Sequence, residues 1–220
     1  MGKEVVELID QAILKRVGAQ APRSYLGASG LGEPCDRKLW YSYKQPKSVD
    51  DPRILRIFDL GNLIEDYMVK LLRDAGYTIH THDEDGKQFG FTDMPIAGSS
   101  DGVLMLPDGP HLAEFKSYNT MRFSTLKKGG VQASDPKYYT QVQVYMGEMG
   151  LDNCLFLALN KNDCEIYTEV IGYDPIEHNW SKNRGHEIAV METEPSRKYT
   201  HKSHFACKMC NWRSECWLNE

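Results

Sequence analysis

Two acids and a lysine near the middle of the chain have the types and the spacing for chemistry at a metal ion. Asp101 lies in the apolar stretch Ile96–Leu106, and Glu114 and Lys116 lie in the next stretch, His111–Tyr118. The intervening Pro-Asp-Gly-Pro cannot continue a ladder, which predicts a β-hairpin. Carboxylate oxygens suit hard cations such as magnesium or manganese. The alternative is an ordinary solvated Glu-Lys pair on an edge strand.

The register of this hairpin decides whether the three side chains share a face. Pairing Leu106 with His111 across a four-residue turn would place Asp101 opposite Lys116. Because side chains alternate along a strand with a period of two, Glu114 then lies on the same face as both of them. We therefore predict that one face of the sheet collects two carboxylates and one ammonium.

A helix upstream of the hairpin carries a further acid. Asp51 is a suitable N-cap, Pro52 suits the first helical position, and Gly76 is a suitable stop. Taken alone, Glu65 in this helix would be an exposed acid. The apolar stripe predicted for the helix comprises Ile54, Ile57, Phe58, Ile64, Tyr67, Met68 and Leu71.

A helix downstream of the hairpin places two polar side chains on one face. Ser134-Asp135-Pro136 is a start signal, and the pattern runs through Met149 to Gly150. Gln141 and Tyr145 are four residues apart and share a face. Spacing alone would make Tyr145 a core residue and Gln141 a surface residue.

The remaining segments predict a mixture of helices and strands. We expect helices over 4–17, 119–128 and 175–193, and strands near 77–82, 87–92, 153–159 and 164–170. The first of these helices is amphipathic, which indicates a packing role. Cys154 and Cys164 fall in the last two strands, where we interpret them as packing residues.

Three cysteines near the end of the sequence have the spacing of metal ligands. Cys207 and Cys210 form a Cys-x-x-Cys turn, and Cys216 follows after five intervening residues. Three ligands leave one position open, and Cys35, at the entry of a short helix, is our candidate for the fourth. Four thiolates suit either zinc or a 4Fe-4S cluster, and ligand type does not choose between them.

The composition limits the classes of protein that fit. With 220 residues and 41% hydrophobic content, the chain can fill one core as a single domain. No apolar run reaches the length of a membrane span and no signal peptide is recognisable, so we expect a cytoplasmic protein without a membrane partner. The net charge of −5 means that contacts to phosphates would need local lysine and arginine clusters. A Gly-x-x-x-x-Gly-Lys-Ser/Thr motif is absent, which excludes a P-loop motor.

The ordered set of acids and lysine resembles the PD-(D/E)XK nuclease superfamily. That resemblance implies a restriction-endonuclease-like α/β fold, with a mixed β-sheet flanked by helices. It also implies that Glu65, Asp101, Glu114 and the backbone carbonyl of Phe115 hold magnesium or manganese. Asp101, Glu114 and Lys116 would be the catalytic residues, with Lys116 orienting the attacking water or helping to deprotonate it.

Within that superfamily the chain resembles the RecB-like iron–sulfur branch. The Gln-x-x-x-Tyr pair, Gln141 and Tyr145, matches the element that contacts nucleic acid. The resemblance implies a single nuclease domain over 1–220, with an N-terminal helical region, a core and a C-terminal cysteine segment over 1–50, 51–172 and 173–220. A structural 4Fe-4S cluster would join the two ends of this domain through Cys35, Cys207, Cys210 and Cys216.

The function implied by these resemblances is hydrolysis of DNA phosphodiester bonds, with exonuclease action on single-stranded ends. CRISPR adaptation nucleases, AddB-type subunits and phage-encoded exonucleases belong to this branch, and the resemblance extends to proteins that act with a partner in recombination, repair or CRISPR adaptation. Two alternatives remain at this level. One is a non-catalytic nucleic-acid-binding module with a zinc-bound cysteine knuckle, and the other is a nuclease-fold subunit that is active only within a partner complex.

Overall fold

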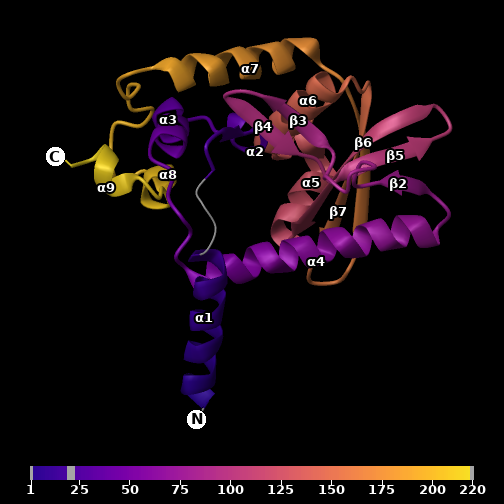
Figure 1. Ribbon diagram of the computed structural model, residues 1–220, viewed down its shortest axis with the longest axis horizontal. Coiled ribbons are helices and arrows are strands. Elements are labelled where there is room, and N and C mark those ends of the chain that lie inside the picture. The colour runs from indigo at the N-terminus through magenta and orange to yellow at the C-terminus, as the bar shows by residue number, and fades with distance from the viewer. Residues whose placement is uncertain (1, 19–22, 219–220) are drawn as a thin grey trace.

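The computed structural model describes residues 2–18 and 23–218. It is an α/β fold in which helices flank two sheets (Figure 1). The helices are α1 (Gly2–Gly18), α2 (Ala28–Leu31), α3 (Asp36–Lys44), α4 (Pro52–Asp74), α5 (Thr120–Ser134), α6 (Pro136–Met149), α7 (Pro175–Val190), α8 (Phe205–Lys208) and α9 (Arg213–Cys216). The strands are β1 (Leu26–Gly27), β2 (Thr78–His80), β3 (Gly90–Asp93), β4 (Ile96–Ser99), β5 (Gly102–Leu106), β6 (Gly109–Tyr118), β7 (Asn153–Asn160) and β8 (Ile166–Gly172).

The larger sheet is mixed, as expected from the sequence. Its strand order is β2-β5-β6-β7-β8, and only the central β6 and β7 run parallel. Helix α5 and then α6 connect these two strands, which is the crossover that a parallel pair requires. The smaller sheet has the order β1-β4-β3. No helix in the described ranges is both long enough and apolar enough to cross a membrane.

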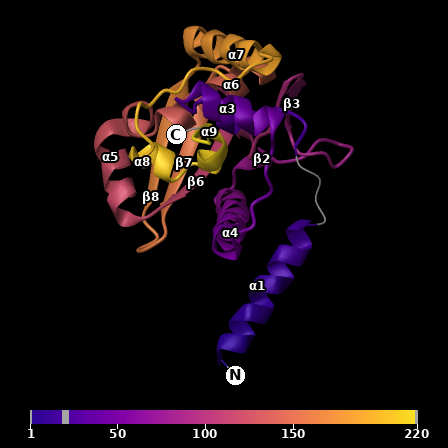
Figure 2. The ribbon, with the colours of Figure 1, turned by 90° about the vertical axis from the view of Figure 1, so that its left-hand side faces the viewer.

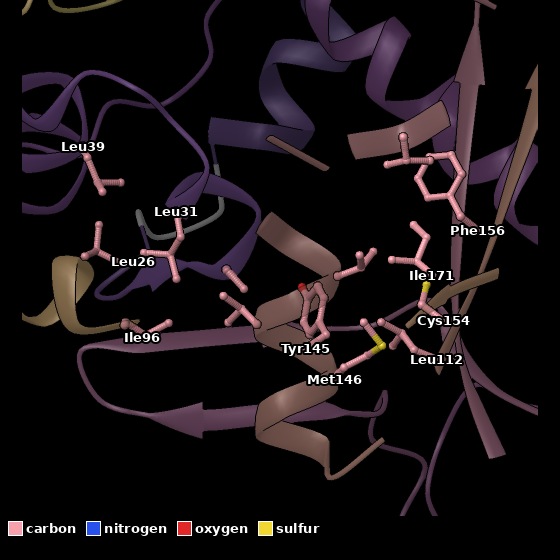
Figure 3. Packing of buried hydrophobic residues seen from close by; sticks show 14 of the residues in the cluster. Leu26, Leu31, Leu39, Ile96, Leu112, Tyr145, Met146, Cys154, Phe156 and Ile171 are labelled. Carbon is pink, nitrogen blue, oxygen red and sulfur yellow. The ribbon is translucent and has the colours of Figure 1, made fainter. Parts of the chain in front are cut away.

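Two apolar cores lie on opposite faces of the larger sheet. The first joins α4 to the sheet through residues such as Met68 and Phe115. The second places α6 between the two sheets, where Tyr145 and Met146 lie among residues of β4, β6 and β7 (Figure 3). The alternation along β6 therefore sends Phe115 to the α4 side and Glu114 to the α6 side. Phe115 is therefore a core residue, and Glu114 lies on the opposite face of the strand.

The hairpin β5–β6 forms, but its predicted register is wrong by two residues. Leu106 pairs with Gly109 and Leu104 pairs with His111, so the turn is two residues shorter than expected. A shift of two residues leaves every side chain on its predicted face. The shift brings Asp101 next to Glu114 along the ladder, because Gly102 pairs with Ala113.

The stretch expected to form the first strand of this hairpin is divided between the two sheets. Residues 96–99 form β4 of the smaller sheet, and residues 102–106 form β5 of the larger sheet. The chain changes sheets at Ser100 and Asp101. Gly102 has a φ of 154° there, and a side chain at this position would meet the His80 carbonyl oxygen at 2.8 Å. This junction is what positions Asp101.

Helix α4 begins as predicted, but its apolar stripe is different. The Asp51 side chain accepts a hydrogen bond from the Arg53 N–H at 2.8 Å, which is a conventional N-cap. Of the stripe predicted from spacing, Ile57, Phe58 and Tyr67 are exposed. Met68 is buried as predicted, Ile64 and Leu71 are partly buried, and Leu55 and Val69, which lie outside the predicted stripe, are buried as well. Ile57 and Phe58 are exposed because the N-terminal half of the helix does not lie against the sheet (Figure 1).

Helix α1 does not have the packing role expected from its amphipathic pattern. It projects away from the body of the molecule, as two perpendicular views show (Figures 1 and 2). Val5, Leu8 and Ile9 are about half exposed. Two ion pairs join this helix to α4, one between Arg16 and Asp59 and one between Arg56 and Asp10.

One local expectation is confirmed and another needs correction. The backbone of α5 leaves the helical conformation at Gly130 (φ 69°, ψ 177°), so the helix expected over 119–128 ends at the glycine pair and a further helical piece follows to Ser134. Cys164 is not a strand residue, because it lies exposed in the β7–β8 turn with a φ of 64°. Cys154 is buried in β7, as predicted.

Candidate active site

The junction between the two sheets fixes Asp101 against the central strand. The Asp101 Oδ2 atom accepts a hydrogen bond from the Phe115 N–H at 2.7 Å. The neighbouring Ser100 is fully buried, and its Oγ donates to the Phe89 carbonyl oxygen at 3.2 Å. Hydrogen bonds to the backbone therefore fix both Ser100 and Asp101, the two residues at which the chain passes from one sheet to the other.

Glu114 is the most deeply buried acid of the site. Its side chain has no exposed surface. The Oε1 atom accepts a hydrogen bond from Gln141 Nε2 at 2.7 Å and forms an ion pair with Lys116 Nζ. The Oε2 atom is buried and has no hydrogen-bond partner among the described residues. An unpaired buried carboxylate oxygen is costly, so this atom is available to a ligand.

Burial perturbs both carboxyl groups, and repulsion from Asp101 adds to the effect on Glu114. Burial raises the pKa of Glu114 to about 7; the charge of Lys116 opposes this rise, and the charge of Asp101 adds to it. Burial also raises the pKa of Asp101, against the influence of Lys116 and the Phe115 N–H. The charge of Asp101 therefore opposes the ionisation of Glu114.

Lys116 keeps its proton in this environment. Burial alone would lower its pKa, but the charges of Glu114 and Asp101 outweigh burial and hold the pKa above its ordinary value. The ammonium lies 5.0 Å from the centre of the Tyr138 ring, which adds a cation–π contact. Lys116 is therefore a fixed positive charge beside two acids.

Glu65 supplies a third acid from α4. Burial raises its pKa to about 7, and the charge of Asp101 contributes in the same direction. The charge of Lys116 opposes the shift. The acid that the helix pattern alone would leave in solvent is thus half-buried and feels the charges of Asp101 and Lys116.

Gln141 and Tyr145 are both buried, and each holds a part of the site. Gln141 holds Glu114 through the hydrogen bond described above. Tyr145 Oη donates to the Ser99 carbonyl oxygen at 2.8 Å, and its ring meets Phe91 edge to face. A side chain at Gly98 would approach the Tyr145 hydroxyl to 2.6 Å, so glycine is needed where β4 passes α6. Spacing alone identified Tyr145 as core but wrongly placed Gln141 on the surface.

The donor set at this site suits a hard cation. The charge of Asp101 raises the pKa of both Glu65 and Glu114, and one oxygen of Glu114 has no partner among the described residues. A divalent ion would offset this concentration of negative charge. Across residues 2–18 and 23–218, no group of three or more His, Cys, Asp or Glu side chains is arranged to hold a metal ion. At the carboxylates, the Lys116 ammonium contacts Glu114 Oε1, so a metal ion would have to compete with Lys116 for that oxygen.

A wide groove leads to the site, and sequence reasoning missed most of its lining. The groove has a volume of about 1180 Å³ and includes Glu65 and Lys116 in its wall. Its basic lining residues are Arg16, Arg23, Lys47, Arg122 and Lys161. These five positions come from separate segments, so no local run of charge in the sequence could have revealed them. Ion pairs with Asp59, Glu215 and Asp135 offset the charges of Arg16, Lys47 and Arg122, so the positive charge that the net charge of the chain conceals comes mainly from Arg23 and Lys161.

The four cysteines singled out by spacing line one small cavity at the other end of the molecule. All four border it, although Cys35 is the N-cap of α3 and Cys207, Cys210 and Cys216 belong to the last segment of the chain. All four thiols are free. Burial raises the pKa of Cys207 and of Cys210, and the charges of Cys35 and Cys216 contribute to each rise.

The comparisons with known proteins show the fold. No protein-family model and no curated protein matches the sequence. Among solved structures, the chain resembles SSO0001, with a TM-score of 0.58 and 14% identity over 99% of this chain and 98% of that chain. It also resembles LHK-Exo, an alkaline exonuclease from Laribacter hongkongensis, with a TM-score of 0.53 and 17% identity over 83% of this chain and 90% of that chain. The same values hold for LHK-Exo in complex with dAMP. The fold is therefore one that an alkaline exonuclease uses.

Proposed function

We propose that this protein is a PD-(D/E)XK nuclease of the RecB-like type, which hydrolyses DNA phosphodiester bonds. The observation that carries the proposal is the buried constellation of Asp101, Glu114 and Lys116, which Glu65 joins from α4. A buried group of acids beside a charged lysine is expensive for a merely structural site. The fold shared with an alkaline exonuclease, 17% identical, supports the same conclusion.

Glu65, Asp101, Glu114 and the Phe115 carbonyl oxygen would hold the magnesium or manganese ion of this enzyme. When bound, such an ion stabilises the negative charge that develops on the phosphate and makes water a better nucleophile. The chain itself contributes the orientation of these ligands. Gln141 holds one oxygen of Glu114, and the Phe115 N–H holds Asp101, so neither carboxylate has to be ordered when substrate arrives.

Lys116 acts as a fixed cation and not as a base. Its raised pKa keeps the ammonium protonated at neutral pH, so it has no lone pair to accept a proton from water. It can instead donate hydrogen bonds to the attacking water or to a phosphate oxygen and stabilise the charge of the transition state. Of the two roles implied by the family resemblance, the electrostatics favour orientation.

We further propose exonuclease action on single-stranded ends, because the basic groove offers a path for a strand and the shared fold is that of an exonuclease. With Mn²⁺ present, linear single-stranded DNA should be degraded to short products, while a closed circle of the same sequence should survive. Gel analysis of both substrates over time measures this. The Glu114→Gln protein should degrade neither. Equal attack on the circle would refute the exonuclease proposal, and an intact linear substrate would refute hydrolysis itself.

The four cysteines would hold a 4Fe-4S cluster that ties the two ends of the domain together. Support comes from the donor chemistry, since thiolates are the ligands of such clusters, and from the cavity that the four thiols share. Arg37 adds to this support, because its guanidinium lies 3.9 Å from the Cys216 sulfur and donates to the Pro195 carbonyl oxygen at 2.6 Å. It can thus balance part of the negative charge of a thiolate-bound centre.

The raised pKa values of Glu65 and Glu114 make the stability of the metal-free protein dependent on pH. Both values are near 7 in the folded protein, against an ordinary value of 4.5. The folded state then holds more protons than the unfolded state, so stability should fall as the pH rises from about 5 to about 8. Differential scanning calorimetry should record a declining Tm over this interval. Added Mn²⁺ should raise the Tm more at the upper end, because it competes with protons for the same oxygens.

Neutral variants test the origin of this pH dependence. Glu114→Gln and Glu65→Gln should each flatten the decline in Tm and weaken the Mn²⁺ effect. Glu192→Gln, at an exposed position remote from the groove lining, should change neither. A decline that persists unchanged in both site variants would show that other groups cause it.

A further inference from the structure

The last segment of the chain carries a concentration of positive charge that the catalytic site does not use. Residues 195–214 contain five of the 26 lysines and arginines and none of the 31 acids of a chain whose net charge is −5. We call residues 195–214 the C-terminal basic segment. Of the acids that flank it, Glu194 pairs with Arg37 and Glu215 pairs with Lys47.

Several side chains of the C-terminal basic segment face solvent. Lys198, Lys208 and Arg213 are exposed, and none of them forms an ion pair within the ranges that the structure covers. Phe205 is 76% exposed, which is unusual for a large apolar ring. Close by in the sequence, the Tyr199 and His204 rings stack with their centres 3.8 Å apart. Exposed cations interleaved with flat rings are the combination that binds the phosphates and bases of single strands.

This segment also adjoins the catalytic groove. Trp212 lines both the cysteine cavity and the groove, and its Nε1 donates to the Gln45 carbonyl oxygen at 3.0 Å. Lys47 lines the groove and donates to the Asn211 carbonyl oxygen at 2.9 Å. The segment and α8 lie beside α3 (Figure 1), at the end of the molecule away from β5. A strand that leaves the groove past Lys47 thus arrives at the C-terminal basic segment.

We propose that the C-terminal basic segment is a second binding surface for single-stranded nucleic acid, continuous with the catalytic groove. Lys198, Lys208 and Arg213 contact phosphates, and Phe205 stacks on a base. This proposal rests on the proposed nuclease function in one respect, namely that the groove is the path along which nucleic acid binds. An acidic protein would also be attracted by the charge, but the exposed ring and the continuity with the groove favour a strand.

The test compares strands that fill the groove with strands that extend beyond it. Fluorescence anisotropy on the full-length protein, without added divalent metal, would measure affinity for oligothymidylates of about 6 and about 25 nucleotides, below and above the span of one single-strand site. The double variant Lys198→Glu/Lys208→Glu should bind the long strand about tenfold more weakly and the short strand unchanged. Loss of two phosphate contacts should also reduce the slope of log K against log salt by about 1.4.

Two further variants separate this effect from general repulsion and from unfolding. Lys87→Glu/Lys128→Glu makes the same charge change at exposed positions outside the groove lining, and should bind both strands as the unmodified protein does. Phe205→Ala retains every charge and should weaken long-strand binding about fivefold, which corresponds to one lost base stack. Unchanged Tm values for all variants confirm that they fold.

The outcomes are distinguishable from those that test the nuclease. The proposal of a second surface is overturned if both charge-reversed variants lose the same affinity for the long strand, or if neither loses any. A segment variant that loses affinity for polyglutamate but keeps affinity for the long strand also overturns it, in favour of an acidic protein partner. If the protein cleaves DNA but the segment variants bind long and short strands equally well, only this inference is refuted. If the segment variants lose affinity for the long strand but the protein never cleaves DNA, only the proposed nuclease function is refuted.

Discussion

Replacing Lys116 with alanine should reduce DNA cleavage by at least about a thousandfold, the upper range for removing one preorganised charge from an active site. The reason is that Lys116 is the cation paired with Glu114 at the base of the groove. The rate constant for degradation of a linear strand, measured at saturating Mn²⁺, checks this. Saturation separates loss of transition-state stabilisation from weaker metal binding.

The fold should survive this substitution. Removing one partner of a buried ion pair costs about 3–5 kcal/mol when the other charge stays uncompensated. Glu114 can escape most of that cost by binding a proton, since its pKa is already about 7 and loss of Lys116 would raise it further. The Tm of Lys116→Ala should therefore approach that of the unmodified protein at pH values below 7. Lys128→Ala removes an exposed lysine outside the groove lining and should retain full activity. Cleavage by Lys116→Ala within twofold of normal would refute the catalytic assignment.

The local features of the site could be predicted from the sequence because they follow from short-range rules. The N-cap of α4 at Asp51, the extent of α6 up to Gly150 and the hairpin after Asp101 all depend on neighbouring residues. The period of two placed Glu114 and Lys116 on one face even though the register was wrong. An error of one residue would have separated Asp101 from them.

The remaining features depend on contacts between distant segments. The change of sheet at Ser100 and Asp101 has no local signal, because the stretch from Ile96 to Leu106 reads as one strand. Gln141 carries a polar side chain on a helix, and only the buried Glu114 opposite it explains why it lies inside. The basic groove is assembled from residues that are far apart in the chain.

The exposed apolar side chains of α1 and α4 show the limit of periodicity arguments. An amphipathic pattern states which face of a helix is apolar, but not whether another element covers that face. Val5 and Leu8 on α1, and Phe58 on α4, satisfy the pattern and nevertheless face solvent. Coverage depends on the length of the sheet, and the N-terminal half of α4 extends beyond it (Figure 1).

The second large effect is expected at the cysteine cavity. Cys207→Ser should lower the Tm by about 8–16 °C, because a lost cluster ligand worth about 4 kcal/mol shifts Tm by about 2–4 °C per kcal/mol in a domain of this size. Cluster binding free energy is folding free energy when the ligands come from distant segments, as Cys35 and Cys207 do. Scanning calorimetry of anaerobically purified protein measures the shift, alongside the absorption spectrum and the iron content.

Cys164→Ser is the matched control, because Cys164 is exposed in the β7–β8 turn and does not border the cavity. Its Tm and its spectrum should equal those of the unmodified protein. The unmodified protein should show a broad band near about 400 nm and about four irons per chain, as four thiolates imply. If the purified protein is colourless and contains zinc, the four cysteines bind a zinc ion and not a 4Fe-4S cluster. The loss of stability expected for Cys207→Ser is the same in that case. A Cys207→Ser protein as stable as the control would refute the proposed metal centre. Hydrogen bonds from α3, such as that from Trp40 Nε1 to the Met191 carbonyl oxygen, would then be enough to hold the last segment of the chain in place.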